Sequence, residues 1–327
     1  MKYKVEPHIV GNLFTKSSHS FRVPEFQRNY VWKVNDQETS QQRHVNLFLE
    51  DIDTSKTEDE NYYIGNIITY SEDTVEHLLV DGQQRITTIA LLFLAFRDFQ
   101  NENIENTENN TENNIEIDEH LKFTQQHLGK EQVKHRLVVA NTSGENFISK
   151  LIDGTSLREI EVSVGSKEML DSYKLCKKFL KEKGIDEARK YIKFVEERVE
   201  LSWIKASDIE SAFIVFDRMN DRGLNLTPSD KFKYLLFQST NPENLLDKSS
   251  QINNDWESIE NTLESIKANI DNFLNYFLAA KHFTDKWPSK SAMISWIRKK
   301  ENREEIGIDD PIPLLKELKE DAAKFRE

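Results

Sequence analysis

The chain has 327 residues and a formal net charge of −13, with 37% hydrophobic and 31% charged residues. This acidic balance argues against a protein that coats DNA through a broad basic face, although it leaves room for a local basic patch. Cys176 is the only cysteine, so the composition excludes an intrachain disulfide and a zinc site built from several thiolates.

No segment has the features of a signal peptide or of a membrane-spanning helix. Residues 1–6 lack the apolar run that a signal peptide requires, and the longest apolar stretch, 86–96, is too short to span a bilayer of about 30 Å. We therefore expect a soluble, cytoplasmic protein that has no membrane partner.

The N-terminal part of the chain alternates between strand-like and helical segments. We expect strands at 21–23, 62–70 and 77–80 and a helix over 41–52. Such an alternation of strands and helices is typical of an α/β unit.

Residues 81–85, with the sequence DGQQR, join the last of these strands to the almost continuously apolar stretch 86–99. The N–H groups at the start of a helix, together with the helix dipole, attract an anion, and a glycine lets the anion come close. Arg85 would add a forked cationic donor that matches phosphate oxygens. The segment therefore suits a phosphate-binding turn.

The same residues also have a purely structural interpretation. Asp81 and Gln84 have the spacing of the N-cap and N3 residues of a capping box, and Gly82 permits a tight turn. The local sequence alone favours this interpretation, because caps open most helices. Evidence from elsewhere in the chain has to decide between the cap and the phosphate site.

The remainder of the chain is mostly helical in pattern. Asparagine and glutamate dominate the segment 100–118, which cannot bury apolar surface, so we interpret it as a flexible surface loop. From about residue 115 the periodicity becomes helical, with helices at 169–183 and 185–198 that are separated by Gly184, and a short strand at 201–204.

Two more helical regions follow. The segment 208–220 has apolar residues on one face, and the next helix begins with Thr227 as N-cap, Pro228 at N1 and Asp230 at N3. Residues 241–327 have the pattern of an aromatic-rich helical bundle, which we expect to lead toward an effector module.

Four blocks occur in order along the chain, with the sequences FRVPEFQRNYVW at 21–32, YIGNI at 63–67, DGQQR at 81–85 and FDRMNDRGLNLTPSDKFK at 216–233. In this order and at this spacing they resemble the GmrSD-type (SspE-like) family, whose N-terminal module has a ParB-like fold. Single motifs of this size are weak signals, but four in series are specific. The resemblance covers roughly residues 8 to 240.

The resemblance implies an α+β protein with a ParB-like α/β unit over 1–240, a nucleotide-associated sensor domain, and a helical extension over 241–327. It makes the DGQQR turn the nucleotide site. By position, Asp81 would hold a divalent metal, Mg²⁺, or a water molecule, and it would act catalytically together with Gln84 and Arg85. The nucleotide-binding residues carried over from the family pattern are Gln27, Arg28, Gly82, Gln83, Thr87, Asn220, Gly223 and Lys233.

Tyr30 and Trp32 are the candidates for a pocket that encloses a base or a modified DNA group, and the aromatic core is the alternative for both. Alternatives also remain for other members of the set. Arg28 is as well suited to an ion pair as to phosphate, and Thr87 inside a helix is more often simply buried.

We carry two main hypotheses for function. In the first, the protein is a GTPase-like nucleoside-triphosphate-binding and hydrolysing sensor of an anti-phage restriction system that acts on modified DNA. In the second, it is a non-hydrolysing DNA-recognition or switch subunit, and the nuclease activity lies in a C-terminal or separate HNH-type module. A ParB-like nuclease is a weaker third option, because no cluster of metal-binding carboxylates is evident. A homo-oligomer is also compatible with the sequence.

Overall fold

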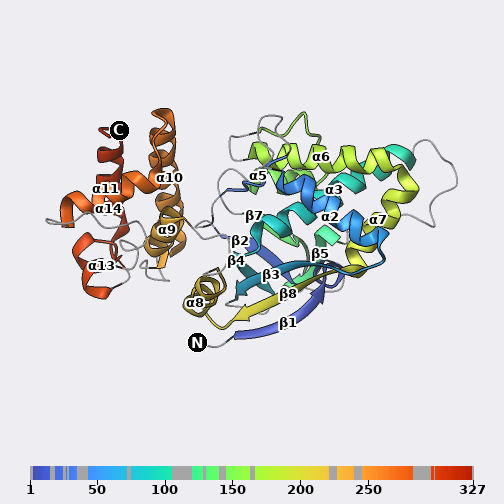
Figure 1. The fold of residues 1–327 in the computed structure, drawn as a ribbon, viewed down its shortest axis with the longest axis horizontal. Helices are drawn as coiled ribbons and strands as arrows, with labels where there is room; N and C mark the ends of the chain where they lie inside the picture. Colours follow the sequence, from blue (N-terminus) through green and yellow to red (C-terminus); the bar gives the residue numbers. More distant parts are fainter. Residues whose placement is uncertain are drawn as a thin grey trace. The chain divides into compact units, whose positions relative to one another are not determined.

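The computed structural model of the chain describes residues 3–14, 19–24, 27, 29–34, 43–71, 75–104, 120–127, 130–139, 145–162, 166–220, 227–238, 245–282, 296–297 and 299–325. These residues form two compact units, which Figure 1 shows in the colours of the sequence. The first unit comprises Met1–Pro24 and Asn29–Arg218, and the second comprises Glu25–Arg28 and Met219–Glu327. Each unit is described by itself.

A mixed six-stranded sheet with the strand order β1-β8-β3-β4-β2-β7 forms the centre of the first unit. The strands are β1 (Tyr3–Ile9), β2 (Ser20–Val23), β3 (Tyr62–Tyr70), β4 (Glu76–Asp81), β7 (Leu137–Val139) and β8 (Val199–Ala206). Strands β4, β2 and β7 run parallel to one another, whereas β3 is antiparallel to β4 and parallel to β8. Strand β1 closes one edge, antiparallel to β8.

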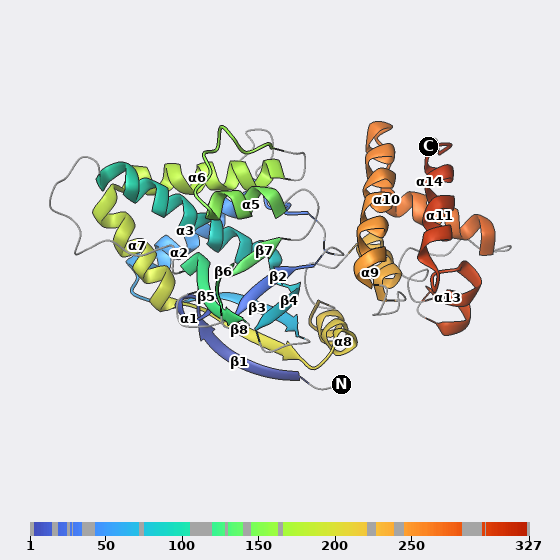
Figure 2. The same ribbon diagram turned by 180° about the vertical axis from the view of Figure 1, so that it is seen from behind.

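Helices cover one face of this sheet, as the two ribbon views show (Figures 1 and 2). They are α1 (Val10–Phe14), α2 (His44–Thr57), α3 (Gln83–Ile104), α5 (Glu145–Ile152), α6 (Lys167–Lys183) and α7 (Ile185–Arg198). Helix α8 (Ile209–Asn220) instead lies beside the ends of β4 and β8 in both views.

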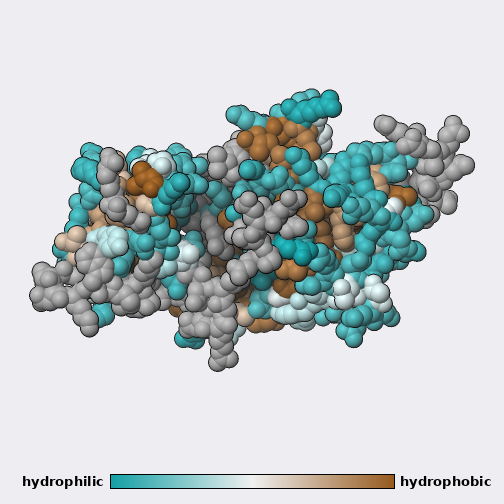
Figure 3. Space-filling model, turned by 45° about the horizontal axis from the view of Figure 1, so that its top comes forward, coloured by the Kyte–Doolittle hydropathy of each residue, from teal (hydrophilic) through white to brown (hydrophobic). Residues whose placement is uncertain are grey.

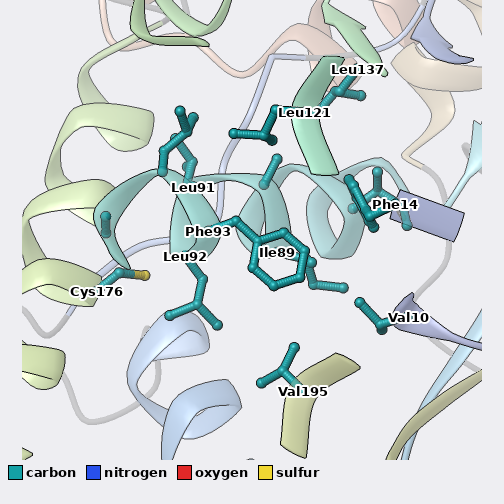
Figure 4. Packing of buried hydrophobic residues seen from close by; sticks show 14 of the residues in the cluster. Val10, Phe14, Ile89, Leu91, Leu92, Phe93, Leu121, Leu137, Cys176 and Val195 are labelled. Carbon is teal, nitrogen blue, oxygen red and sulfur yellow. The ribbon is translucent and has the colours of Figure 1, made fainter. Parts of the chain in front are cut away.

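Helix α3 is the core element of the first unit. Every residue over 89–96 is fully buried, and a helix that is apolar all round has to lie inside a protein. Figure 4 shows Leu92 and Phe93 of α3 among side chains from α1, α6 and α7. Because this helix is fixed on all sides, the turn that precedes it is held at a defined place in the fold.

The second unit is helical and has a hydrophobic core of its own. Its helices are α9 (Pro228–Gln238), α10 (Leu245–Ser265), α11 (Ile270–His282), α13 (Lys300–Ile306) and α14 (Pro311–Ala322). The core contains Phe232, Trp256, Phe273 and Phe277, all buried. Together the two units confirm the predicted α+β class with a mostly helical remainder. The predicted division into domains at residue 240 stays a prediction.

Three helices begin or end at residues whose local chemistry predicts the boundary. The backbone N–H of Thr227 donates to Asp230 Oδ2 at 3.1 Å, and the N–H of Asp230 donates to Thr227 Oγ1 at 3.2 Å. This reciprocal pair is a capping box, and it confirms the predicted start of α9. Gly184, with φ of +76°, separates α6 from α7 as predicted.

Several elements differ from the sequence prediction. Strand β1 was not predicted, and β5 (Lys122–His127), β6 (Lys130–His135) and β7 occupy a region where helical texture was expected. Strands β5 and β6 form a separate two-stranded sheet in the described part of the chain, and they are rich in polar residues, so their period-2 pattern is weak. Helix α3 continues to Ile104, so residues 100–104 of the predicted loop are helical. Residues 105–118 of that loop lie outside the described residues.

The exterior agrees with the high charge content of the sequence. Figure 3 shows a face on which hydrophilic residues predominate among the described ones, with smaller hydrophobic areas between them. None of the helices in the described ranges is long and apolar enough to cross a lipid bilayer.

Candidate functional site

The DGQQR turn lies at the edge of the sheet where three parallel strands end. Because β2, β4 and β7 are parallel, their carboxyl ends meet at the same edge, and Asp81 is the last residue of β4. In open sheets with helices, ligands bind in the crevice outside the carboxyl ends of such strands. The fold therefore places the turn where a ligand site is expected.

Gly82 makes the tight connection between β4 and α3 possible. Its φ of +91° lies in the left-handed region that favours glycine. A Cβ atom at this position would lie 2.5 Å from Ile67 Cγ2 and 3.2 Å from Ile67 Cα, so a neighbouring backbone leaves no room for a side chain. Only glycine allows the chain to enter α3 this close to β3.

The capping-box interpretation of Asp81 and Gln84 is wrong. The N–H of Ile86 donates to Gly82 O at 3.0 Å, which makes Gly82 the N-cap and leaves Asp81 in β4. The strand continues one residue further than predicted, and the Gln84 side chain points elsewhere. The N–H groups of Gln84 and Arg85 precede the helical hydrogen-bond ladder, as an anion site at a helix start requires.

Arg85 is fixed against the neighbouring strand. Its Nη2 donates to Asn66 O at 2.7 Å and to Asp81 Oδ2 at 3.1 Å, and both charged side chains remain partly exposed. The guanidinium lies against Gly65, where a Cβ atom would be 2.9 Å from Nη1. Within the described part of the chain, hydrogen bonds of Arg85 use only Nη2, so Nε and Nη1 keep their donors for a ligand.

Gln84 holds the first sequence block onto α3. Its Oε1 accepts hydrogen bonds from the backbone N–H groups of Val31 at 2.9 Å and Trp32 at 3.2 Å. Its Nε2 donates to Asn29 O at 3.3 Å. The amide predicted to act in catalysis thus binds backbone on both sides, and the geometry makes Gln84 a positioning residue.

Tyr30 and Trp32 both pack against other elements of the first unit. Tyr30 is only 1% exposed, its hydroxyl lies 2.8 Å from Thr88 Oγ1, and burial raises the pKa of the phenol well above its usual range. The Trp32 ring is partly buried, and it stacks on His44 and packs against Phe48 of α2. This placement favours the core interpretation of Tyr30 over a DNA-reading role.

Two other predicted residues face the interior. Gln83 and Thr87 are both buried, and the Thr87 hydroxyl has no hydrogen-bond partner within the ranges that the structure describes. At the surface, the turn therefore presents the side chains of Asp81 and Arg85, whereas Gly82 is buried.

The remaining predicted residues belong to the second unit or lie outside the described residues. Gln27 is partly buried, and Asn220 is the last residue of α8, with its side chain not described. Lys233 is partly buried in α9, where burial lowers its pKa and the carboxylates of Glu260 and Asp230 act in the opposite direction. Arg28 and Gly223 lie outside the described residues.

Gly65 and Asn66 are site residues that the sequence analysis did not select. They belong to the second of the four blocks. The backbone carbonyl of Asn66 accepts a hydrogen bond from Arg85, and Gly65 leaves room for the guanidinium because it has no side chain. A glycine inside a strand pattern is a signal for a bulge or for close approach of another group. A carbonyl contact, in contrast, leaves no trace in residue identity.

The fold and the site define an α+β protein with a phosphate-compatible turn at the carboxyl edge of a mixed sheet. The family model described as GmrSD restriction endonuclease, N-terminal domain, matches residues 10–237. The match covers more than half of the chain and includes all four blocks, so the chain belongs to this family and is a component of a restriction system. A comparison with curated proteins found no match.

Proposed function

We propose that this protein binds a nucleoside triphosphate at the DGQQR turn and hydrolyses it, as the cytoplasmic sensor of an anti-phage restriction system that recognises modified DNA. The observation that carries the proposal is the arrangement of Arg85. Its guanidinium is held at the start of α3 by Asn66 O and Asp81, while Nε and Nη1 keep their donors for phosphate oxygens.

This arrangement would bind phosphate without large rearrangement. The ion pair with Asp81 fixes the guanidinium before the ligand arrives, so less side-chain freedom is lost on binding. The helix start of α3 adds backbone N–H groups and the positive end of its dipole. Charge-assisted hydrogen bonds of this kind contribute about 1.5–3 kcal/mol each.

Asp81 is the residue that we propose for the chemical step. Its Oδ2 pairs with Arg85, but its Oδ1 has no hydrogen-bond partner among the residues described, so Oδ1 can orient an attacking water molecule. Gln84 does not compete for this role, because its amide binds the backbone of the first block.

A metal ion would enter with the nucleotide. Among the described residues, no three His, Cys, Asp or Glu side chains are grouped so that they could hold a metal. Mg²⁺ is commonly bound through one or two carboxylates plus substrate phosphates and keeps several of its waters, so Asp81 would hold it through the water molecule that Oδ1 orients. Bound in this way, Mg²⁺ would neutralise charge that develops on the transferred phosphoryl group.

The proposal is tested with Arg85→Ala and Asp81→Asn, both in the full chain. We expect Arg85→Ala to weaken triphosphate binding by about tenfold or more, which corresponds to the loss of one charge-assisted contact. Asp81→Asn should retain binding but lose phosphate release, since a carboxamide cannot act as the base. Calorimetry and a phosphate-release assay with each of the four nucleoside triphosphates measure the two effects.

Arg85→Lys is the matched control, because it retains the positive charge but loses the planar guanidinium that can donate two parallel hydrogen bonds to phosphate. Equal triphosphate affinity for wild type and Arg85→Ala, with unchanged melting curves, would contradict a phosphate site at the turn. Unchanged turnover in folded Asp81→Asn would contradict its role as the base.

A second candidate function is a nucleotide-binding switch without hydrolysis. The ion pair between Asp81 and Arg85 favours it, because Asp81 Oδ2 is engaged by the guanidinium and only Oδ1 is left to contact a water molecule. In that case the nuclease module of the system would carry out all bond cleavage. Tight nucleotide binding without phosphate release from any of the four nucleotides would select this function.

A further inference from the structure

The sheet face opposite the helices carries a polar cluster beside the DGQQR turn. The hydroxyl of Tyr63 donates to Asn66 Oδ1 at 2.8 Å and lies 2.9 Å from Ser202 Oγ, whose own hydroxyl can donate to it. Tyr63 is 54% exposed, so its ring lies at the surface while its hydroxyl is fixed at both sides. The three residues come from the neighbouring strands β3 and β8.

A bulge in β3 brings Tyr63 and Asn66 to the same face. Side chains alternate between faces along a regular strand, so residues three apart would point to opposite sides. The pairing of β3 with β8 shifts between Tyr63 and Asn66, where Gly65 has a φ of +98°. Bulges of this kind re-aim side chains and are found next to active sites.

The same bulge connects the cluster to the turn. Asn66 accepts the hydrogen bond of Arg85 Nη2 with its backbone oxygen and that of Tyr63 with its side chain. Asp81 pairs with Ile68, two residues beyond Asn66 in β3, so the side chains of Asp81 and Asn66 share this face. A continuous row of contacts therefore runs from the phosphate-compatible turn to an exposed aromatic ring.

We propose that the Tyr63 ring is the platform on which the base of the bound nucleotide stacks. This inference rests on the proposed function, because it assumes that the phosphates lie at Arg85. The ring has the flat, exposed face that stacking requires, and its two hydrogen bonds limit the freedom that would be lost on binding. The Nδ2 of Asn66 has no hydrogen-bond partner in the described ranges, and it is available to the sugar or to the edge of the base.

The test compares a nucleotide with inorganic tripolyphosphate, each in the presence of Mg²⁺, on the full chain. The nucleotide is the triphosphate that wild type binds most tightly. Tyr63→Ser should weaken nucleotide binding by about tenfold and leave tripolyphosphate binding unchanged, because only the base is lost from the contact. Tyr63→Phe should retain most of the affinity, since it keeps the ring. The matched control is Tyr3→Ser, which removes an equally exposed tyrosine (50%) from the edge strand β1.

The outcomes separate this inference from the proposed function. If Tyr63→Ser and wild type bind the nucleotide equally, stacking of the base on Tyr63 is contradicted, whereas phosphate binding at Arg85 is not. If Tyr63→Ser lowers affinity for modified DNA and leaves nucleotide affinity unchanged, the assignment to the nucleotide base is likewise overturned. If Arg85→Ala leaves tripolyphosphate binding unchanged, the proposed function fails, and the platform fails with it. A melting curve for each variant shows whether the fold is retained.

Discussion

At the scale of single residues, the site depends on contacts that side-chain identity alone does not reveal. Gly65 contributes the absence of a side chain, and Asn66 contributes its backbone oxygen as well as its amide. Arg85 is the residue that both of them position. The chemistry of the turn is therefore set by the neighbouring strand as much as by the DGQQR sequence.

Replacement of Gly65 by alanine should disturb Arg85 and destabilise the first unit. The new Cβ would lie 2.9 Å from Arg85 Nη1, and a φ of +98° is strained for any L residue. We expect a loss of about 1–3 kcal/mol in the free energy of unfolding, measured by urea denaturation. Gly154→Ala is a suitable control for strain alone, because its φ is also positive but its Cβ would meet nothing within 4 Å. A loss no larger than that of the control would show that the guanidinium adjusts freely.

At the scale of elements, two helix starts with similar sequence signals are built differently. Thr227 and Asp230 form a capping box, whereas the residues of the same spacing before α3 do not. The difference lies in what precedes the helix. Strand β4 holds Asp81 in the sheet, so the cap position passes to Gly82.

Loss of the capping box should weaken α9. Thr227→Ala removes the acceptor for the N–H of Asp230, and such substitutions cost about 1 kcal/mol. Thermal melting or hydrogen exchange of α9 measures the effect. Thr262→Ala in α10 is the control, because its hydroxyl donates to Ser258 O in the preceding turn of its own helix. Equal effects of the two substitutions would mean that the box contributes nothing.

The ion pairs of Glu6 in the edge strand β1 should stabilise the fold more at neutral pH than at acidic pH. Hydrogen bonds from Lys205 and Lys4 lower the pKa of Glu6 from about 4.5 to about 2. Since the folded pKa is the lower one, the stabilisation is present above pH 4.5 and is lost as the pH falls toward 2. Glu6→Gln should therefore flatten the dependence of unfolding free energy on pH across this window. An unchanged slope would show that these ion pairs add no stability.

At the scale of the whole molecule, charge limits how the protein can meet DNA. A net charge of −13 opposes tight, sequence-independent binding, which depends on the number of phosphates that are neutralised. The recognition of modified DNA that we propose then has to be local. Because Tyr30 is buried, an aromatic detector of modified DNA on the surface has to consist of other residues.

Plain duplex DNA should bind weakly at physiological salt, and affinity should rise selectively for modified DNA. Fluorescence anisotropy titrations with matched plain and modified duplexes measure both affinities. Tyr30→Phe should bind both duplexes as wild type does, because it removes only the hydroxyl that contacts Thr88 and preserves the core ring. Equal affinity of wild type for the two duplexes would contradict modification sensing by this chain.

The accuracy of the sequence prediction followed the locality of the forces involved. Strand β3 and helix α7 have their predicted bounds, because alternation and helical periodicity are properties of a short segment. The pairing of β7 with β2 and the edge position of β1 depend on residues far away in the chain. The DGQQR turn could be recognised because it is one short segment. The role of Asn66 could not, because it depends on a contact with Arg85, which lies 19 residues further along the chain.

The two glycines at the site differ in whether other substitutions can compensate for their loss. At position 82 the obstacle includes the backbone of Ile67, so no change of the Ile67 side chain alone makes room. At position 65 the obstacle is the end of the Arg85 side chain. In a mutational scan, no substitution of Gly82 should be tolerated, whichever residue stands at position 67. The stability lost in Gly65→Ala should be partly restored when Arg85 is replaced by a shorter residue. Epistasis between positions 65 and 85 would then be a genetic signature of the contact.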